Sequence, residues 1–306
     1  MTIVATMVKL FATMLVGFFL GKKDIFSPEI CKKLSWVIVN ISGPAIVLAS
    51  VTSMEEAAGD SVVVALIFGA CCYAVLPFVG WIFAKLLRVD KDLTGTYILT
   101  ILLCNNTFMG FPVVQALLGD EAIFYTSIIH FGFNIMFYAV GLALIQKDAN
   151  TDSGEKFNPR KLINTGTISG ILVVILFFGR IGLPMVVAEP LDFIGGLTMP
   201  MSMLVIGANM SQYNLKEVFG DKRMYILSVM RLVIVPLLIW LIMQPLIHDE
   251  FLIKVTTITF AMPVAALVAM GTAPYEKQGK TGAVAVAFTT LCSLITIPMW
   301  ALFLGM

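Results

Sequence analysis

Ten stretches of the sequence are each long and apolar enough to cross a membrane as a helix. About 20 apolar residues cover the roughly 30 Å of a bilayer's hydrocarbon core. The chain is 59% hydrophobic and only 13% charged, whereas soluble domains carry about 25% charged residues. The sequence therefore predicts an all-α integral membrane protein. The expected spans are 2–20, 34–52, 62–84, 95–118, 122–145, 162–180, 190–209, 224–245, 251–272 and 281–305.

Basic residues divide unequally between the two sides of the predicted bundle. Of the 20 Lys and Arg, 16 fall in the loops after spans 1, 3, 5, 7 and 9, whereas Arg180 and Lys254 lie on the other side. Because cytoplasmic loops are rich in Lys and Arg, we expect a multi-pass protein of the cytoplasmic membrane with both termini outside. The first span has no cleavage signal and is expected to be retained. The 16 basic residues are Lys22, Lys23, Lys32, Lys33, Lys85, Arg88, Lys91, Lys147, Lys156, Arg160, Lys161, Lys216, Lys222, Arg223, Lys277 and Lys280.

The sequence is duplicated about a polar connector at residues 146–161, with five spans in 1–145 and five in 162–306. Three prolines recur in order at spacings of 156, 159 and 151 residues, and one pair shares a Pro-x-x-x-Trp motif. Because five is odd, the second copy crosses the membrane in the opposite direction, as in the inverted repeats of secondary transporters. The matched pairs are Pro44 with Pro200, Pro77 with Pro236 and Pro112 with Pro263.

Spans 4 and 9 are expected to be broken near the membrane midplane. A proline removes a backbone donor, and in lipid such a break survives only inside protein or beside a water-filled cavity. Each new half-helix would present its N-terminus at the midplane, where free N–H groups and the helix dipole favour an anion. Two ordinary proline kinks are the alternative, but the matched depth and the Asn-Asn-Thr cluster favour a binding site. The candidate binding residues there are Asn105, Asn106, Thr107, Gly110, Pro112, Met262, Pro263 and Val264.

Other polar side chains lie within the predicted spans. His130 and Asn134 are four residues apart on one helix face. His130 could carry a coupling proton, or it could be a neutral histidine bonded to a neighbour. Asn40 could line the site or satisfy the kink at Pro44. Arg231 could attract a carboxylate, but its position favours snorkelling to the cytoplasmic surface.

These motifs resemble the auxin efflux carrier family, which includes plant auxin carriers and bacterial malate-type permeases. The resemblance rests on the Asn-Asn-Thr…Gly-Phe-Pro break, "AMPVAALVA" in span 9, "NPRKL" at span 6 and "MSMLVIGANM" in span 7. It covers the whole chain and implies a sodium/proton-antiporter-like architecture in which broken helices 4 and 9 cross. It also implies a scaffold of spans 1, 2, 6 and 7, a homodimer, and a transport domain of spans 3–5 and 8–10 that moves like an elevator. The implied substrate is a small organic anion, and the short connector fits a malate-permease-like bacterial member.

Several classes of function are disfavoured. No Asp or Glu lies near the middle of a predicted span, which disfavours antiport through buried carboxylates. No hydrolase motif and no zinc-type cysteine spacing is present, so we expect no enzyme, metal or cofactor, and a net charge of +1 suggests no nucleic acid. The expected function is a secondary transporter for a carboxylate. The alternatives are a sodium-coupled symporter of the bile-acid-carrier type and a channel or sensor on this fold; the coupling ion stays open.

Overall fold

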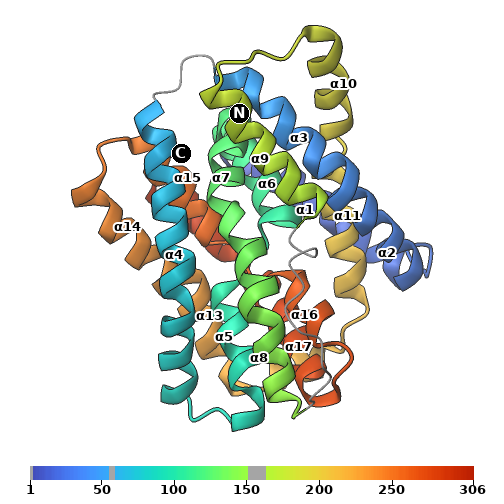
Figure 1. Ribbon diagram of the computed structural model, residues 1–306. Helices are drawn as coiled ribbons and strands as arrows, with labels where there is room; N and C mark the ends of the chain where they lie inside the picture. Colours follow the sequence, from blue (N-terminus) through green and yellow to red (C-terminus); the bar gives the residue numbers. More distant parts are fainter. Residues whose placement is uncertain (1–2, 55–58, 151–162) are drawn as a thin grey trace.

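The computed structural model describes residues 3–54, 59–150 and 163–306. Within these ranges the chain is helical almost throughout, as its composition predicts (Figure 1). Most of the predicted connector, with Lys156, Arg160 and Lys161, lies outside the described residues. In the first half the elements are α1 Ile3–Lys22, α2 Pro28–Val37, η1 Ile38–Ser42, α3 Gly43–Ala49, η2 Ser50–Met54, α4 Gly59–Leu86, η3 Lys91–Leu93, α5 Thr94–Leu102, η4 Asn106–Gly110, α6 Phe111–Leu118, α7 Asp120–Met136, η5 Phe137–Gly141 and α8 Leu142–Asp148. In the second half they are α9 Thr165–Phe178, α10 Met185–Gly195, α11 Thr198–Ser211, α12 Leu215–Gly220, α13 Lys222–Val229, η7 Met230–Ile234, α14 Val235–Leu246, α15 Glu250–Phe260, α16 Ala266–Thr272 and α17 Glu276–Phe303.

Seven of the described helical runs are long and apolar enough to cross a membrane, so the chain is a multi-pass membrane protein. Two further apolar helices, 106–118 and 165–178, are shorter. The predicted spans 4 and 9 are each divided into two short helices, so neither qualifies by length. The ten-span inverted repeat therefore stays a prediction. One short helix on the connector between α11 and α13, α12, was not predicted.

Three of the intramembrane prolines follow a widened π-type turn. The turns η1, η4 and η7 each end two residues before a proline, at Pro44, Pro112 and Pro236. A proline ring clashes with the carbonyl four residues back, and in each case that carbonyl lies inside the π-turn. In η7 this carbonyl belongs to Leu232 and accepts a 2.8 Å hydrogen bond from the Trp300 indole. The helices thus continue past all three prolines, and at Pro236 the freed carbonyl has a side-chain donor.

Helices α1 and α11 approach each other backbone to backbone. A Cβ added at Gly17 would collide with the backbone of Leu204, and one added at Gly207 would collide with the backbone of Met14. In a membrane, helices associate through close packing rather than through the hydrophobic effect, and small residues allow it. A larger residue at either glycine would separate the two helices.

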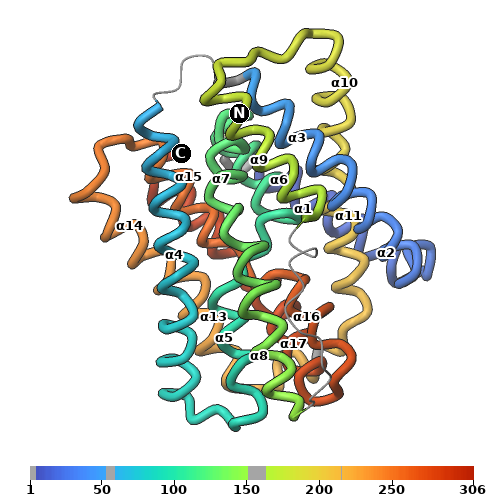
Figure 2. Tube along the Cα trace, viewed as in Figure 1, coloured from blue at the N-terminus to red at the C-terminus, as the bar shows by residue number. Residues whose placement is uncertain are grey.

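The helices fall into two groups by their contacts. Helices α1, α2 and α3 pack with α9, α10 and α11, whereas α4, α5, α7 and α8 pack with one another and with α15 to α17. Figure 2 shows the blue α2 and α3 beside the yellow α10 and α11 on the right, and the cyan α4 with the orange α14 on the left. Both chain termini lie toward the upper end in Figure 1, and the turn between α4 and α5 lies at the lower end.

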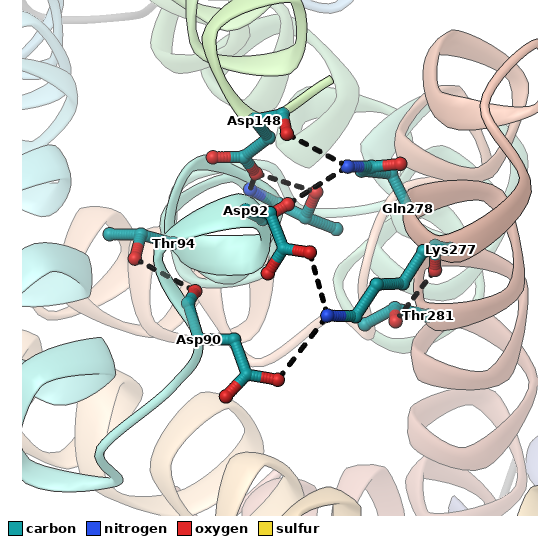
Figure 3. Close-up of polar contacts among 8 residues, drawn as sticks. Asp90, Asp92, Thr94, Asp148, Lys277, Gln278 and Thr281 are labelled. Carbon is teal, nitrogen blue, oxygen red and sulfur yellow. Dashed lines mark hydrogen bonds and ion pairs between the residues drawn. The ribbon is translucent and has the colours of Figure 1, made fainter. Parts of the chain in front are cut away.

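A polar network ties three helices together at the lower end (Figure 3). The Asp148 carboxylate accepts hydrogen bonds from the backbone N–H of Gly95 and of Thr96, at 2.8 and 2.7 Å, and so caps the N-terminus of α5. Gln278 of α17 donates to the carbonyls of Asp92 and Asp148, at 2.9 and 3.0 Å. The ends of α5, α8 and α17 are therefore held as one unit.

Candidate functional site

The two broken helices meet at their breaks. The Asn105 N–H donates to the Pro263 carbonyl at 2.8 Å, and the Ala265 N–H donates to the Leu103 carbonyl at 3.0 Å. The two breaks thus form a short antiparallel pair. In Figure 1, α6 and α15 lie above this crossing, and α5 and α16 lie below it. Each break satisfies backbone groups of the other, which the interior of a membrane requires.

The break in the first of these helices lies earlier than the prolines suggest. Helix α5 ends at Leu102, and helical structure resumes at Asn106, so Pro112 is the second residue of α6 and not the first residue of the half-helix. The π-turn η4 accommodates Pro112, so this proline does not itself open the chain. In the other helix, Pro263 does lie inside the non-helical segment between Phe260 and Ala266.

Asn106 lies buried at the centre of the crossing. Its amide Nδ2 donates to the Cys104 sulfur at 3.2 Å and lies 3.3 Å from His130 Nδ1. Its Oδ1 has no partner. A Cβ at Gly110 would lie only 2.9 Å from this oxygen, so a glycine is needed there to leave the amide room. A buried acceptor without a donor is costly and points to a ligand or water that completes the site.

His130 connects the break to α7. With the Asn106 amide oriented so that its nitrogen faces the ring, His130 Nδ1 is the acceptor, and the matching neutral tautomer carries its proton on Nε2. Nε2 lies 3.5 Å from the Thr107 hydroxyl. The ring stacks on Phe133, with 4.4 Å between ring centroids. This arrangement suits the neutral, hydrogen-bonded histidine, while a role in proton coupling stays a prediction.

Two cavities flank the crossing. The larger, of ≈ 290 Å³, lies between α2 and α11 on one side and η4, α16 and α17 on the other. Asn105 lines it, together with Asn209 and Tyr213. The smaller, of ≈ 70 Å³, is lined by Thr107 of η4, by His130 of α7 and by residues of α3 and α9. The Asn-Asn-Thr run therefore reaches both cavities from a single break.

Comparison with known proteins decides the family. A family model described as "Membrane transport protein" matches residues 2–301. The chain belongs to this family, the auxin efflux carriers. It is similar to an uncharacterized transporter of Methanothermobacter thermautotrophicus, at 23% identity over 98% of this chain and 97% of the relative. Another uncharacterized transporter, from Methanocaldococcus jannaschii, is 25% identical over 94% of each chain. The uncharacterized transporter YfdV of Escherichia coli is 21% identical over 94% of this chain and 93% of its own length.

The remaining predicted site residues of this membrane transporter are less closely grouped. Asn134 lines the smaller cavity. Met262 and Val264 are fully buried within the crossing and line neither cavity. Asn40 also lines neither cavity. Its side-chain amide donates a hydrogen bond to the Trp36 carbonyl at 2.9 Å and accepts one from a threonine of α9. These bonds hold the Asn40 side chain against its own helix and α9, and its role at the site stays a prediction.

Arg231 is the clearest correction to the sequence analysis of this transporter. The side chain is 0% exposed and does not snorkel to the surface. Its Nη1 donates at 2.8 Å to the carbonyl of Phe260, the last residue of α15. The sequence favoured snorkelling because Arg231 lies close to the cytoplasmic end of its span. That prediction is wrong, because no signal in the sequence shows that η7 packs against the end of α15.

Two further residues at the crossing went unpredicted. Thr289 of α17 accepts from the Val264 N–H at 3.1 Å and so satisfies a donor that the break leaves free. The Tyr73 hydroxyl of α4 lies 3.6 Å from the Cys104 sulfur. Both side chains stand in apolar helices and carry no local motif, so only the fold reveals them.

Proposed function

We propose that this transporter is a carrier that moves a small organic anion, such as a carboxylate, across the cytoplasmic membrane. The observation that carries the proposal is the crossing of the two broken helices, where the buried Asn106 amide retains an unpaired oxygen and its neighbours Asn105 and Thr107 each line a cavity. Binding at paired helix breaks near the midplane is typical of secondary transporters. A carboxylate in the larger cavity could accept hydrogen bonds from the side-chain amide of Asn105, while a water or the acid's own hydroxyl donates to the free oxygen of Asn106.

The electrostatics of the crossing favour an anion. The helix that starts at Asn106 directs its N-terminal N–H groups and its positive dipole end toward the break. The buried Arg231 adds a full positive charge nearby. No described Asp or Glu forms a hydrogen bond or ion pair with the residues of the crossing, so no carboxylate among the described residues opposes an anion there.

The position of the larger cavity suits an elevator mechanism. Its walls come from both groups of helices, with α11 on one side and α16 and α17 on the other. Movement of α4–α8 and α13–α17 against α1–α3 and α9–α11 would carry the crossing from one membrane face to the other. With the basic loops on the cytoplasmic side, this cavity opens inward and both termini lie outside. We further propose ten spans in two inverted repeats, a boundary near residues 146–161, and a homodimer formed through the scaffold helices.

Ligand-dependent thermal stabilisation tests the site. The purified protein is heated with lactate, malate, succinate or indole-3-acetate, because a ligand that binds only the folded state raises its apparent stability. An acid that stabilises the wild type but not Asn106→Ala would support binding at the break. Asn214→Ala serves as the matched control, since Asn214 caps an exposed short helix away from the crossing. Stabilisation that is equal in Asn106→Ala would move the site elsewhere.

Flux measurements separate a carrier from a channel or a sensor. In proteoliposomes loaded with unlabelled acid, a carrier takes up labelled acid by saturable exchange. A channel instead gives a conductance that does not saturate at the same concentrations, and a sensor binds the acid without moving it. Stabilisation by sodium or a neutral solute, with no response to any acid, would contradict the organic-anion proposal.

A further inference from the structure

Arg231 is a buried charge that no acidic residue in the described part of the chain balances. It lies in η7, and its side chain has no exposed surface. Nη1 bonds the Phe260 carbonyl, but Nε and Nη2 have no partner. The titratable side chains that act on Arg231 are those of Cys104 and Tyr73, which are neutral groups. No described carboxylate pairs with it, although a charge isolated from water normally requires a partner.

The position of the guanidinium explains how it is tolerated. It caps the C-terminus of α15, where the helix dipole and the free carbonyls carry negative partial charge. Helix α5 ends at the same crossing, so two negative helix ends converge there. In cation-coupled carriers, half-helix C-termini and unwound carbonyls of this kind coordinate the bound sodium ion or proton. The Arg231 side chain reaches one of these helix ends in place of such an ion.

We propose that Arg231 is a built-in cation that takes the place of a coupling ion, so that this transporter binds its organic anion without sodium. The proposal rests on the proposed function and names the ionic requirement of the same site. Arg231 lines neither cavity, so it acts on the anion through the field at the crossing and through the geometry of the α15 end. It is thus a positioning residue. One fixed positive charge balances one carboxylate, so a monovalent acid leaves the loaded crossing neutral.

The test measures thermal unfolding of the full-length protein in sodium chloride and in choline chloride, with malate and indole-3-acetate as probe acids. The wild type should show the same acid-dependent rise in Tm in both salts. In choline, Arg231→Gln should bind the acid at least about tenfold more weakly, because an anion in a buried site loses its compensating charge. Sodium should partly restore this binding. Arg231→Lys should keep an acid-dependent rise in Tm that does not depend on sodium. Lys222→Gln removes an exposed charge of the same span and should behave like the wild type.

The proposal is overturned if the wild type needs sodium to respond to the acid, or if Arg231→Gln responds like the wild type in choline. If Arg231→Gln does not give a monodisperse protein, the wild type and Arg231→Lys decide. Sodium-independent shifts in both support the proposal, and a sodium requirement in either contradicts it.

A failure of the proposed function gives a different pattern, in which no acid shifts any variant. In that case, thermal unfolding of the wild type and of Arg231→Gln is compared in sodium chloride and in choline chloride without acid, and this comparison decides the role of Arg231. Sodium that stabilises Arg231→Gln but not the wild type supports a cation site filled by the guanidinium. Any other pattern, including no response to sodium in either protein, overturns it.

Discussion

At the scale of single residues, Asn106 and Gly110 depend on each other. The amide of Asn106 folds back over Gly110, where a Cβ would lie 2.9 Å from Oδ1 and 3.2 Å from the Asn106 Cβ. Both atoms belong to one side chain that is also held by His130, so it cannot move without losing that contact. The observed conformation of the Asn106 amide therefore depends on the absence of a methyl group four residues away.

The substitution Gly110→Ala tests this dependence. It should destabilise the protein by about 1–3 kcal/mol, as other insertions into packed interiors do, and should abolish the acid-dependent shift in Tm. Gly220→Ala is the matched control, because a Cβ at Gly220 meets nothing within 4 Å. Thermal unfolding with and without the acid measures both effects. A Gly110→Ala protein that binds the acid like the wild type would show that the observed Asn106 conformation is not needed.

At the scale of elements, Thr289 joins α17 to the break before α16. Thr289→Val should cost about 1–3 kcal/mol, because the Val264 N–H is left buried without an acceptor. Thr290→Val is nearly isosteric and removes only a hydroxyl that donates to the Val286 carbonyl of its own helix. Thermal unfolding should thus separate the two variants clearly. Equal losses of stability in the two variants would mean that a water molecule accepts the hydrogen bond of the Val264 N–H in place of Thr289.

The ion pair between η3 and α17 should make stability depend on pH in the acidic range. The hydrogen bond from Lys277, 2.6 Å away, lowers the pKa of Asp92. A lowered pKa stabilises the fold above the ordinary value for Asp, about 3.9, and the effect is lost as pH falls through the folded pKa. The advantage in Tm of the wild type over Asp92→Asn should therefore shrink from pH 5 toward pH 3, and salt should reduce it. If the difference in Tm between the wild type and Asp92→Asn widened as the pH fell, the ion pair of Asp92 with Lys277 would not be its cause.

The elements also show how far the sequence leads. The helical class, the unbroken spans to within a few residues, and the two breaks follow from hydropathy and proline. The onset of the break at Leu103 was missed, because a π-turn absorbs Pro112. The resemblance groups spans 1 and 7 in one scaffold, but the close backbone contact of α1 with α11 was not predicted, although Gly17 and Gly21 form a G-x-x-x-G pattern that indicates close packing. The pairing of Arg231 with the end of α15 is tertiary, so no local pattern contains it.

At the scale of the whole molecule, the proposed mechanism requires two helix groups to move against each other. One contact between them joins α9 to α7, where a Cβ at Gly170 would lie 3.6 Å from Phe131 Cδ2. Cysteines at these two positions would stand close enough for a mercury ion to bridge their sulfurs. Such a bridge should fix the two groups in the observed arrangement. It would stand at the smaller cavity, which Gly170 lines, and leave open the larger one, which Asn105 lines.

The double variant Phe131→Cys with Gly170→Cys therefore tests the elevator directly. It is made in a background in which Cys71, Cys72 and Cys292, the native cysteines that are exposed or half-buried, are replaced by alanine. Mercury should lower exchange of the acid at least about tenfold and leave the acid-dependent Tm shift in place, because binding needs only the crossing whereas transport needs the movement. Each single cysteine variant should be insensitive. If the bridge forms and exchange continues at the original rate, the two groups do not slide past each other at this contact, and the acid must pass by a smaller rearrangement around the crossing.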